Sequence, residues 1–351
     1  MSQPTDSRRR LPLLSLLVWG IVLALLAWAL TTVPLAEALA ALARLRLWQI
    51  AILLVGNAAI LILFAARWWL ILRALGHPIP YFSLAGYRWA AYGITYFTPG
   101  SQFGGEPLQI ALIRRRHGVP TSTAVASVAL ERLLELVGNF SVLAAGVAFT
   151  LGGPLPGGAA RAEGAAMALA LLMIPVGFLG ATWLGRHPIS WLLARLPARI
   201  RRSSRIRRLA EGVADSEEQA AALIRQRPWT VVEAMLASGV AWIALFGEMG
   251  LAVAFLGVPV TPMRLIAVMT AARVAILLPS PGGLGTLEAG QVWMFGALGL
   301  DPALGLSLSL IVRLRDTLFA ATGLAWGALL TRPARRSPAI PPPPGAEEGG
   351  G

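Results

Sequence analysis

Long apolar runs, separated by short polar segments rich in arginine, occupy most of this chain of 351 residues. Each run reaches or exceeds the roughly 18 to 20 residues with which an α-helix crosses a bilayer. The uninterrupted runs lie at about 11–33, 49–75, 121–150, 164–185, 229–256 and 303–330. This pattern predicts an all-α integral membrane protein with about six transmembrane helices.

Two further apolar stretches, 82–115 and 263–299, are interrupted by the segments FTPGSQFGGEP and LPSPGGLGTLE. Proline and clustered glycine cannot lie within a continuous helix without freeing backbone groups. Irregular backbone is tolerated in a membrane only where it is buried in protein or lines a water-filled cavity. We therefore expect each stretch to form either a broken spanning helix or a re-entrant helical hairpin.

The positions of the arginines decide between these alternatives. If both stretches are hairpins and the N-terminus is inside, most arginines fall on the cytoplasmic side, including Arg114–Arg116 and ten between Arg186 and Arg227. A full crossing at 82–115 would place Arg114–Arg116 outside, against the positive-inside rule. The sequence thus predicts two re-entrant hairpins, with both termini cytoplasmic.

This topology divides the chain into a cytoplasmic tail at 1–10, one membrane domain at 11–330 and a disordered tail rich in proline and glycine at 331–351. An arginine-rich cytoplasmic connector, 186–228, lies inside the domain. Its leucine, isoleucine and tryptophan residues alternate with arginine, which favours helices lying on anionic lipid over a nucleic-acid site.

Composition excludes several classes of protein. Hydrophobic residues make up 56% of the chain and charged residues only 13%, about half the charge of a soluble domain. All 30 basic residues are arginine, and cysteine is absent. A phosphate-loop ATPase, a Schiff-base lysine and a thiolate nucleophile are therefore excluded. The three histidines share no ligand spacing, so we expect no metal, no cofactor and no enzymatic activity.

An internal repeat is visible at one sequence offset. Its landmarks, 181 or 182 residues apart, are Pro99 and Pro281, Glu106 and Glu288, Arg132 and Arg313, and Glu135 and Asp316. The offset predicts a repeat 1 at about 49–185 and a repeat 2 at about 229–330. A unit made of helix, hairpin, helix and helix contains an odd number of crossings, so the second copy is inverted. Inverted repeats with discontinuous helices are typical of alternating-access transporters.

Four charged residues of the repeat lie near the middle of predicted spanning helices. These are Arg132, Glu135, Arg313 and Asp316. Each such charge costs about 2.5–3.5 kcal/mol on insertion scales and therefore needs a partner or water. Two interpretations remain open: i,i+3 ion pairs that only hold helices together, or a polar cavity for a charged ligand.

The hairpin tips add candidate binding groups. Helices that begin near Glu106 and near Thr286, the expected N-cap, would point their positive ends toward the midplane, where they could bind a lipid phosphate. Alternatively, Glu106 and Glu288 only complement the helix dipoles. We expect the tip glycines to turn sharply and to let the backbone approach a ligand. These glycines are Gly104, Gly105, Gly282 and Gly283.

Four more ionisable residues lie within or near apolar stretches: Arg67, Arg88, Arg273 and Glu248. Snorkelling of the side chain to the membrane interface is the favoured role for each. Arg88 and Arg273, on the first arms of the two hairpins, are also candidates for lining the entrance of a binding site.

These segments resemble a known family. The strings PGSQFGGEPLQIALIRRRHGV, ALERLLELVGNF, LLPSPGGLGTLEAG and RLRDTLFAATG are similar to the lysylphosphatidylglycerol synthase transmembrane-region family over about residues 10–330. That family includes the flippase half of the multiple peptide resistance factor. Its bifunctional members carry a soluble aminoacyl-transferase domain after the membrane region, whereas this chain ends about twenty residues after its last predicted span.

The resemblance implies a flippase-like transporter of a charged or glycosylated phospholipid in the bacterial inner membrane, without the synthase chemistry. Arg132 and Arg313 would hold the phosphate, and the acidic residues would balance charge or bind a cationic head group. Two alternatives stay open: a secondary transporter of a small polar solute, and a non-transporting membrane partner of lipid-synthesis enzymes. Assembly into a homo-oligomer also stays open.

Overall fold

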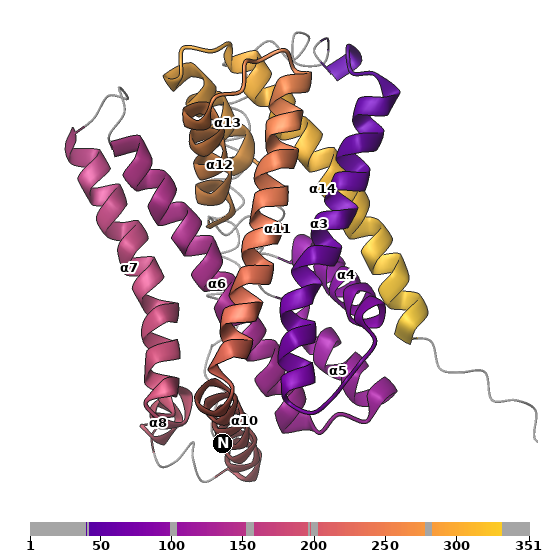
Figure 1. The fold of residues 1–351 in the computed structure, drawn as a ribbon, viewed down its shortest axis with the longest axis vertical. Helices are drawn as coiled ribbons and strands as arrows, with labels where there is room; N and C mark the ends of the chain where they lie inside the picture. Colours follow the sequence, from indigo (N-terminus) through magenta and orange to yellow (C-terminus); the bar gives the residue numbers. More distant parts are fainter. Residues whose placement is uncertain are drawn as a thin grey trace, which may run out of the picture.

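The computed structural model of the chain describes residues 40, 42–98, 104–151, 158–195, 197, 203–277 and 283–331. These residues form helices and no strand (Figure 1). The predicted tail at 1–10, the predicted span at 11–33 and all but the first residue of the 331–351 tail lie outside the described residues.

Four of the described helices are long and apolar enough to cross a membrane. They are α3 (Leu47–Ala74), α6 (Thr121–Leu151), α7 (Gly158–Trp183) and α11 (Pro228–Phe255). Helix α14 (Pro302–Thr331) is equally long but carries three charges in its middle. Large apolar side chains such as Leu236, Ile243 and Leu314 are exposed on these helices, as expected where lipid covers the surface. An all-α membrane protein is thereby confirmed.

Each interrupted stretch is a pair of shorter helices. The first contains α4 (Tyr81–Phe97) and α5 (Glu106–His117), and the second contains α12 (Pro262–Leu277) and α13 (Thr286–Ala297). The α4–α5 pair lies in the lower half of the molecule in Figure 1, and the α12–α13 pair lies in the upper half. The helices end where the sequence predicts, because proline and glycine cluster there.

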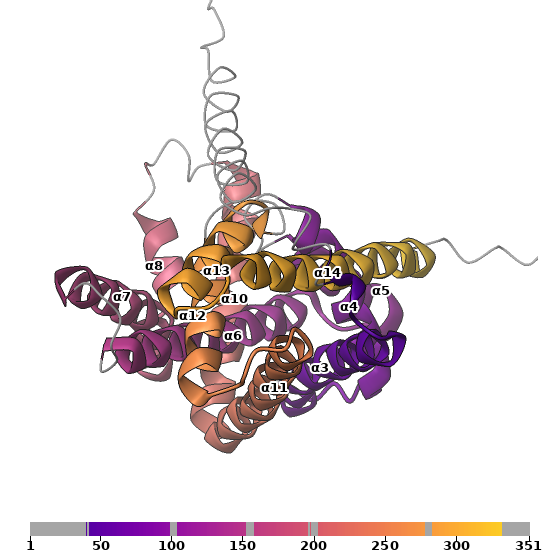
Figure 2. The same ribbon diagram turned by 90° about the horizontal axis from the view of Figure 1, so that it is seen from above.

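The helices of the two halves are interleaved. Helix α3 packs along α11, as both views show, while α4 packs against α14 and α12 packs against α6 (Figure 2). Glycines allow the close approach of backbones at these crossings. A Cβ atom on Gly93 of α4 would lie 2.6 Å from the carbonyl oxygen of Ala320, and one on Gly146 of α6 would meet the hydroxyl of Thr270.

The arginine-rich connector contains α8 (Pro188–Ala194) and α10 (Ser204–Gln226). Leu223 and Ile224 near the end of α10 are buried, in a cluster shared with α6 and α11. This part of α10 therefore packs on protein and not on lipid. Helix α8 does expose Trp191 and Leu192.

The α4–α14 crossing yields a stability prediction. A Cβ atom on Gly323 would lie 2.5 Å from the carbonyl oxygen of Trp89, so Gly323→Ala should lower the free energy of unfolding by about 1–3 kcal/mol. Gly177→Ala in α7 is the matched control, since a Cβ atom on Gly177 would have nothing within 4 Å. Thermal unfolding in detergent compares the two variants, and equal midpoints would contradict the close crossing.

Candidate functional site

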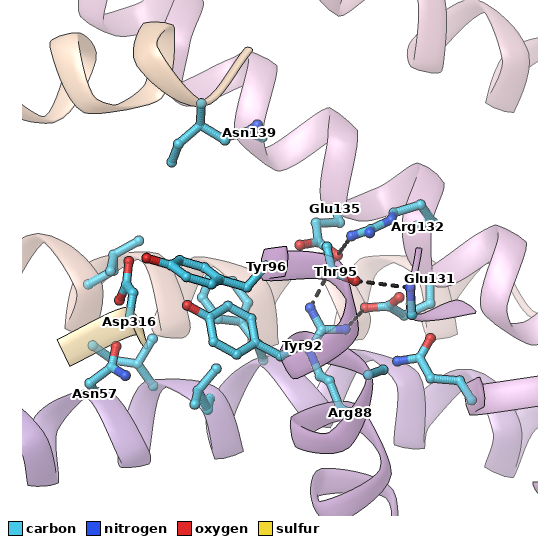
Figure 3. A pocket seen from close by; sticks show the side chains of 18 of the residues that line it. Asn57, Arg88, Tyr92, Thr95, Tyr96, Glu131, Arg132, Glu135, Asn139 and Asp316 are labelled. Atoms are coloured by element: carbon cyan, nitrogen blue, oxygen red, sulfur yellow. Dashed lines mark hydrogen bonds and ion pairs between the residues drawn. The ribbon is translucent and has the colours of Figure 1, made fainter. Parts of the chain in front are cut away.

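A cavity of about 250 Å³ lies where α3, α4, α6, α11, α12 and α14 meet, beside the start of α5. Four arginines and four carboxylates line it: Arg88, Arg132, Arg273, Arg315, Glu106, Glu131, Glu135 and Asp316. In Figure 3, Arg88 and the charged residues of α6 gather on one side, while Tyr92 and Tyr96 extend toward Asp316. So many charges are costly between apolar helices unless they are paired or hydrated.

The carboxylates of α6 form the centre of one charge cluster. Glu135 accepts hydrogen bonds from Arg132 at 2.9 Å, from Arg88 at 3.1 Å and from Arg67 at 3.2 Å. Glu131 accepts from Arg67 at 2.7 Å and also from Arg88. The i,i+3 pair of Arg132 and Glu135 is therefore present, but it is one contact within a larger network that connects α3, α4 and α6.

Arg67 and Arg88 do not snorkel. Arg67 is fully buried in α3, and its guanidinium also donates to the hydroxyl of Ser238 on α11 at 2.9 Å. Arg88 on α4 points at both carboxylates of α6. The expectation of snorkelling is therefore wrong for both residues. Their guanidinium groups bind carboxylates inside the protein and do not extend to the membrane interface.

A second cluster lies on α14. Arg315 donates to Glu248 of α11 and, at 2.9 Å, to its neighbour Asp316. Glu248 is 5% exposed and Arg315 is 8% exposed, so the expectation of snorkelling is wrong for Glu248 as well. The ion pair of Asp316 is thus with the adjacent Arg315, and that of Arg313 is with Glu288, in place of the i,i+3 pairing of these two residues.

Glu106 of α5 and Glu288 of α13 have matching contacts. Glu106 accepts from the backbone N–H of Gly104 at 2.7 Å and from Arg132 Nη2 at 2.6 Å. Glu288 accepts from the N–H of Gly285 at 2.9 Å and from Arg313 Nη2 at 2.8 Å. Each carboxylate thus lies at the positive end of its helix, in the first turn, and also neutralises an arginine.

These contacts bear on two expectations about the tips. Glu106 and Glu288 each place a carboxylate in the first turn of their helix, where it complements the helix dipole. Thr286 is the first residue of α13, not its N-cap, and its hydroxyl donates to the carbonyl groups of Ala275 and Gly283.

The tip glycines differ from one another. Gly104 and Gly283 have φ angles of 142° and 70°, which favour glycine. Gly105 borders the cavity, but a Cβ atom there would meet the carbonyl group of Ala91. Gly105 is therefore a position of close helix packing. The backbone of α4 covers the side of Gly105 on which a Cβ atom would lie, so a ligand cannot approach from there. Gly282 lies outside the described residues.

The structure brings only part of the predicted site to one place. Seven predicted residues line the cavity, namely Arg88, Gly105, Glu106, Arg132, Glu135, Arg273 and Asp316. Glu288, Arg313, Gly104 and Gly283 are not among the residues that line it. Arg313 and Glu288 instead form a separate pair, with a further bond of 3.1 Å from Arg313 to the carbonyl oxygen of Gly283.

Several cavity residues were missed by the sequence analysis. Tyr92 and Tyr96 lie four residues apart on α4, and Tyr96 contacts the hydroxyl of Thr317 at 3.0 Å. Asn57 of α3 and Asn139 of α6 also line the cavity. The sequence features that could have pointed to these residues are two tyrosines at helical spacing and single asparagines inside apolar helices. Within the described ranges, no group of three His, Asp or Glu residues could hold a metal ion.

A bundle of long apolar helices around a cavity with balanced charges defines a multi-pass membrane protein with an internal polar site. The family described as the lysylphosphatidylglycerol synthase TM region matches residues 13–323. The chain belongs to this family, in agreement with the resemblance seen in its sequence. No curated protein matches the chain significantly, and neither does any solved structure.

Proposed function

We propose that this protein is a lipid flippase-like transporter that moves a charged or glycosylated phospholipid between the leaflets of a bacterial inner membrane. The main observation in support of this proposal is the charged cavity. Its walls hold four arginines and four carboxylates among helices long enough to cross a membrane. Ionisable groups inside a membrane domain generally mark a substrate path, and membership of a lipid-related family favours a lipid as the substrate.

Inverted repeats with two re-entrant hairpins are part of this proposal. The pairing of Glu106 with Arg132 has its counterpart in Glu288 with Arg313, at offsets of 182 and 181 residues. The packing is reciprocal too, since α4 of repeat 1 packs on α14, while α12 of repeat 2 packs on α6. Two such halves around a central site are the arrangement from which alternating access arises.

The cavity residues then have distinct roles. Arg88 and Arg132 stabilise the anionic part of the head group, and Glu106, Glu135 and Asp316 balance charge or bind a cationic group such as lysyl. Movement is downhill or coupled to protons or the membrane potential, and we propose no enzymatic step. Exposed arginines of α10 such as Arg207 and Arg208 bind anionic lipid at the cytoplasmic face.

Reconstitution tests this function. Proteoliposomes that contain fluorescent phosphatidylglycerol are treated with a membrane-impermeant quencher. The protein should expose inner-leaflet label that stays protected in protein-free liposomes. Uptake of glycerol 3-phosphate or lysine without movement of the lipid would favour the solute transporter, and movement of neither would favour the partner of lipid-synthesis enzymes.

The proposed topology gives a separate prediction. The chain has no cysteine, so single cysteines report cleanly on sidedness. Cysteine at Arg116 or Ser203 should react with an impermeant maleimide only from the cytoplasmic side, and cysteine at Gly158 only from outside. Labelling of position 116 from outside would contradict the hairpin at 82–115 and, with it, the inverted repeat.

A further inference from the structure

Arg273 differs from the other three arginines of the cavity. Arg88, Arg132 and Arg315 each form an ion pair with at least one carboxylate. Arg273 forms none within 4.0 Å in the described part of the chain, and its buried Nε has no hydrogen-bond partner there. Its guanidinium lies 5.2 Å from the ring centroid of Trp242. A cation in a cavity wall that has an aromatic neighbour and no ion pair has capacity for an anion.

An apolar groove of about 580 Å³ lies between α6, α11 and the first part of α12. Its walls are almost entirely hydrocarbon. They are formed by Val142, Ala145, Gly146, Phe149, Phe246, Val260, Thr261, Pro262, Leu265, Ile266 and Thr270. The groove is lined by α6 and α11, two of the helices long enough to cross a membrane, so hydrocarbon chains are its natural occupants.

Residues that line the groove lie close to residues that line the polar cavity on three helices. On α6, Asn139 lines the cavity, and Val142, one turn further, lines the groove. On α12, Arg273 lines the cavity, and Thr270, one turn earlier, lines the groove. On α11, Leu245 lines the cavity and the adjacent Phe246 lines the groove.

We propose that the cavity and the groove form one amphipathic site, in which Arg273 binds the phosphate of a phospholipid and the groove holds an acyl chain. Three observations carry this inference. Arg273 has no ion pair within the described residues, Thr270 of the apolar groove lies one helical turn from it, and the carboxylates of Glu106 and Glu288 lie at both hairpin N-termini. The inference deepens the proposed function and rests on it. It adds a residue of repeat 2, Arg273, to Arg88 and Arg132 as a contact of the anionic head group.

Binding to the purified full-length protein in detergent, measured by native mass spectrometry, tests the site. The probes are dioctanoyl phosphatidylglycerol, dioctanoylglycerol without a phosphate, and glycerol 3-phosphate without chains. Arg273→Gln should weaken binding of dioctanoyl phosphatidylglycerol about tenfold or more, because a charge-assisted contact is lost. Binding of dioctanoylglycerol should not change.

Ala145→Phe, at an exposed position of the groove, should weaken binding of both lipids. Arg264→Gln and Ala148→Phe are the matched controls. Arg264 is half-buried on α12 and Ala148 is exposed on α6, and neither residue lines the cavity or the groove. Unfolding midpoints establish that each variant is folded.

Wild-type affinity for dioctanoyl phosphatidylglycerol in Arg273→Gln would overturn the assignment of the phosphate. Glycerol 3-phosphate that binds as tightly as the lipid would overturn the role of the groove. If the protein moves lipid in proteoliposomes while Arg273→Gln and Ala145→Phe bind lipid normally, the proposed binding site is wrong and the proposed function stands. If the binding pattern is as expected but no lipid moves, the site stands and the transport function is wrong.

Discussion

Glu131→Leu is expected to lower the free energy of unfolding by about 3–5 kcal/mol, the usual cost of removing one partner from a buried ion pair. Glu131 is 3% exposed and accepts from both Arg67 and Arg88. Its loss leaves three arginines of the α6 cluster facing two carboxylates, Glu106 and Glu135. Titration with sodium dodecyl sulfate in mixed micelles measures the change.

The double variant Arg67→Leu/Glu131→Leu provides the control. It restores equal numbers of positive and negative charges in the cluster, and apolar replacement of a buried pair is often neutral or stabilising. We expect it to recover most of the stability that Glu131→Leu loses. A double variant as unstable as the sum of its two single variants would contradict the view that charge balance holds this cluster together.

The helical spans could be predicted from the sequence because an apolar run of sufficient length has few other solutions in a membrane. The ends of α4 at Phe97 and of α12 at Leu277 could be predicted too, because the proline and glycine residues that follow cannot continue a helix. Glu106 and Glu288 were singled out by their offset in the sequence, and in the structure each of them pairs with an arginine.

The partners of the charges could not be predicted. A single sequence shows neighbours at i,i+3 and i,i+4 on one helix, whereas Arg67 and Glu131 are 64 residues apart. Arg67 and Glu248 lie 181 residues apart in the sequence and carry opposite charges. Arg67 faces carboxylates of α6, whereas Glu248 faces Arg315 of α14. Only the packing of α3 on α6 and of α11 on α14 reveals why the signs differ.

The largest effect on transport is expected from the double variant Arg132→Gln/Glu135→Gln. Both residues line the cavity and bind each other at 2.9 Å. Replacing both keeps the net charge of the cluster. Arg67 and Arg88 keep Glu131 as their partner, and Glu106 keeps the hydrogen bond from the backbone N–H of Gly104. The protein should therefore remain folded, while translocation of fluorescent phosphatidylglycerol in proteoliposomes falls about tenfold or more, because charged contacts to the head group are lost.

Arg313→Gln/Glu288→Gln is the matched variant, because this is also an ion pair of an arginine with a glutamate, but neither residue is among those that line the cavity. We expect it to retain more translocation than the first double variant at comparable unfolding midpoints. The comparison separates a role of the charges in binding the lipid from a role in holding the fold together. Neutralising one residue of a pair cannot separate them, because the unpaired buried charge destabilises the fold and thereby mimics a loss of function. Equal translocation by both folded variants would mean that the charges only hold helices together, and that the cavity is not the path of the lipid head group.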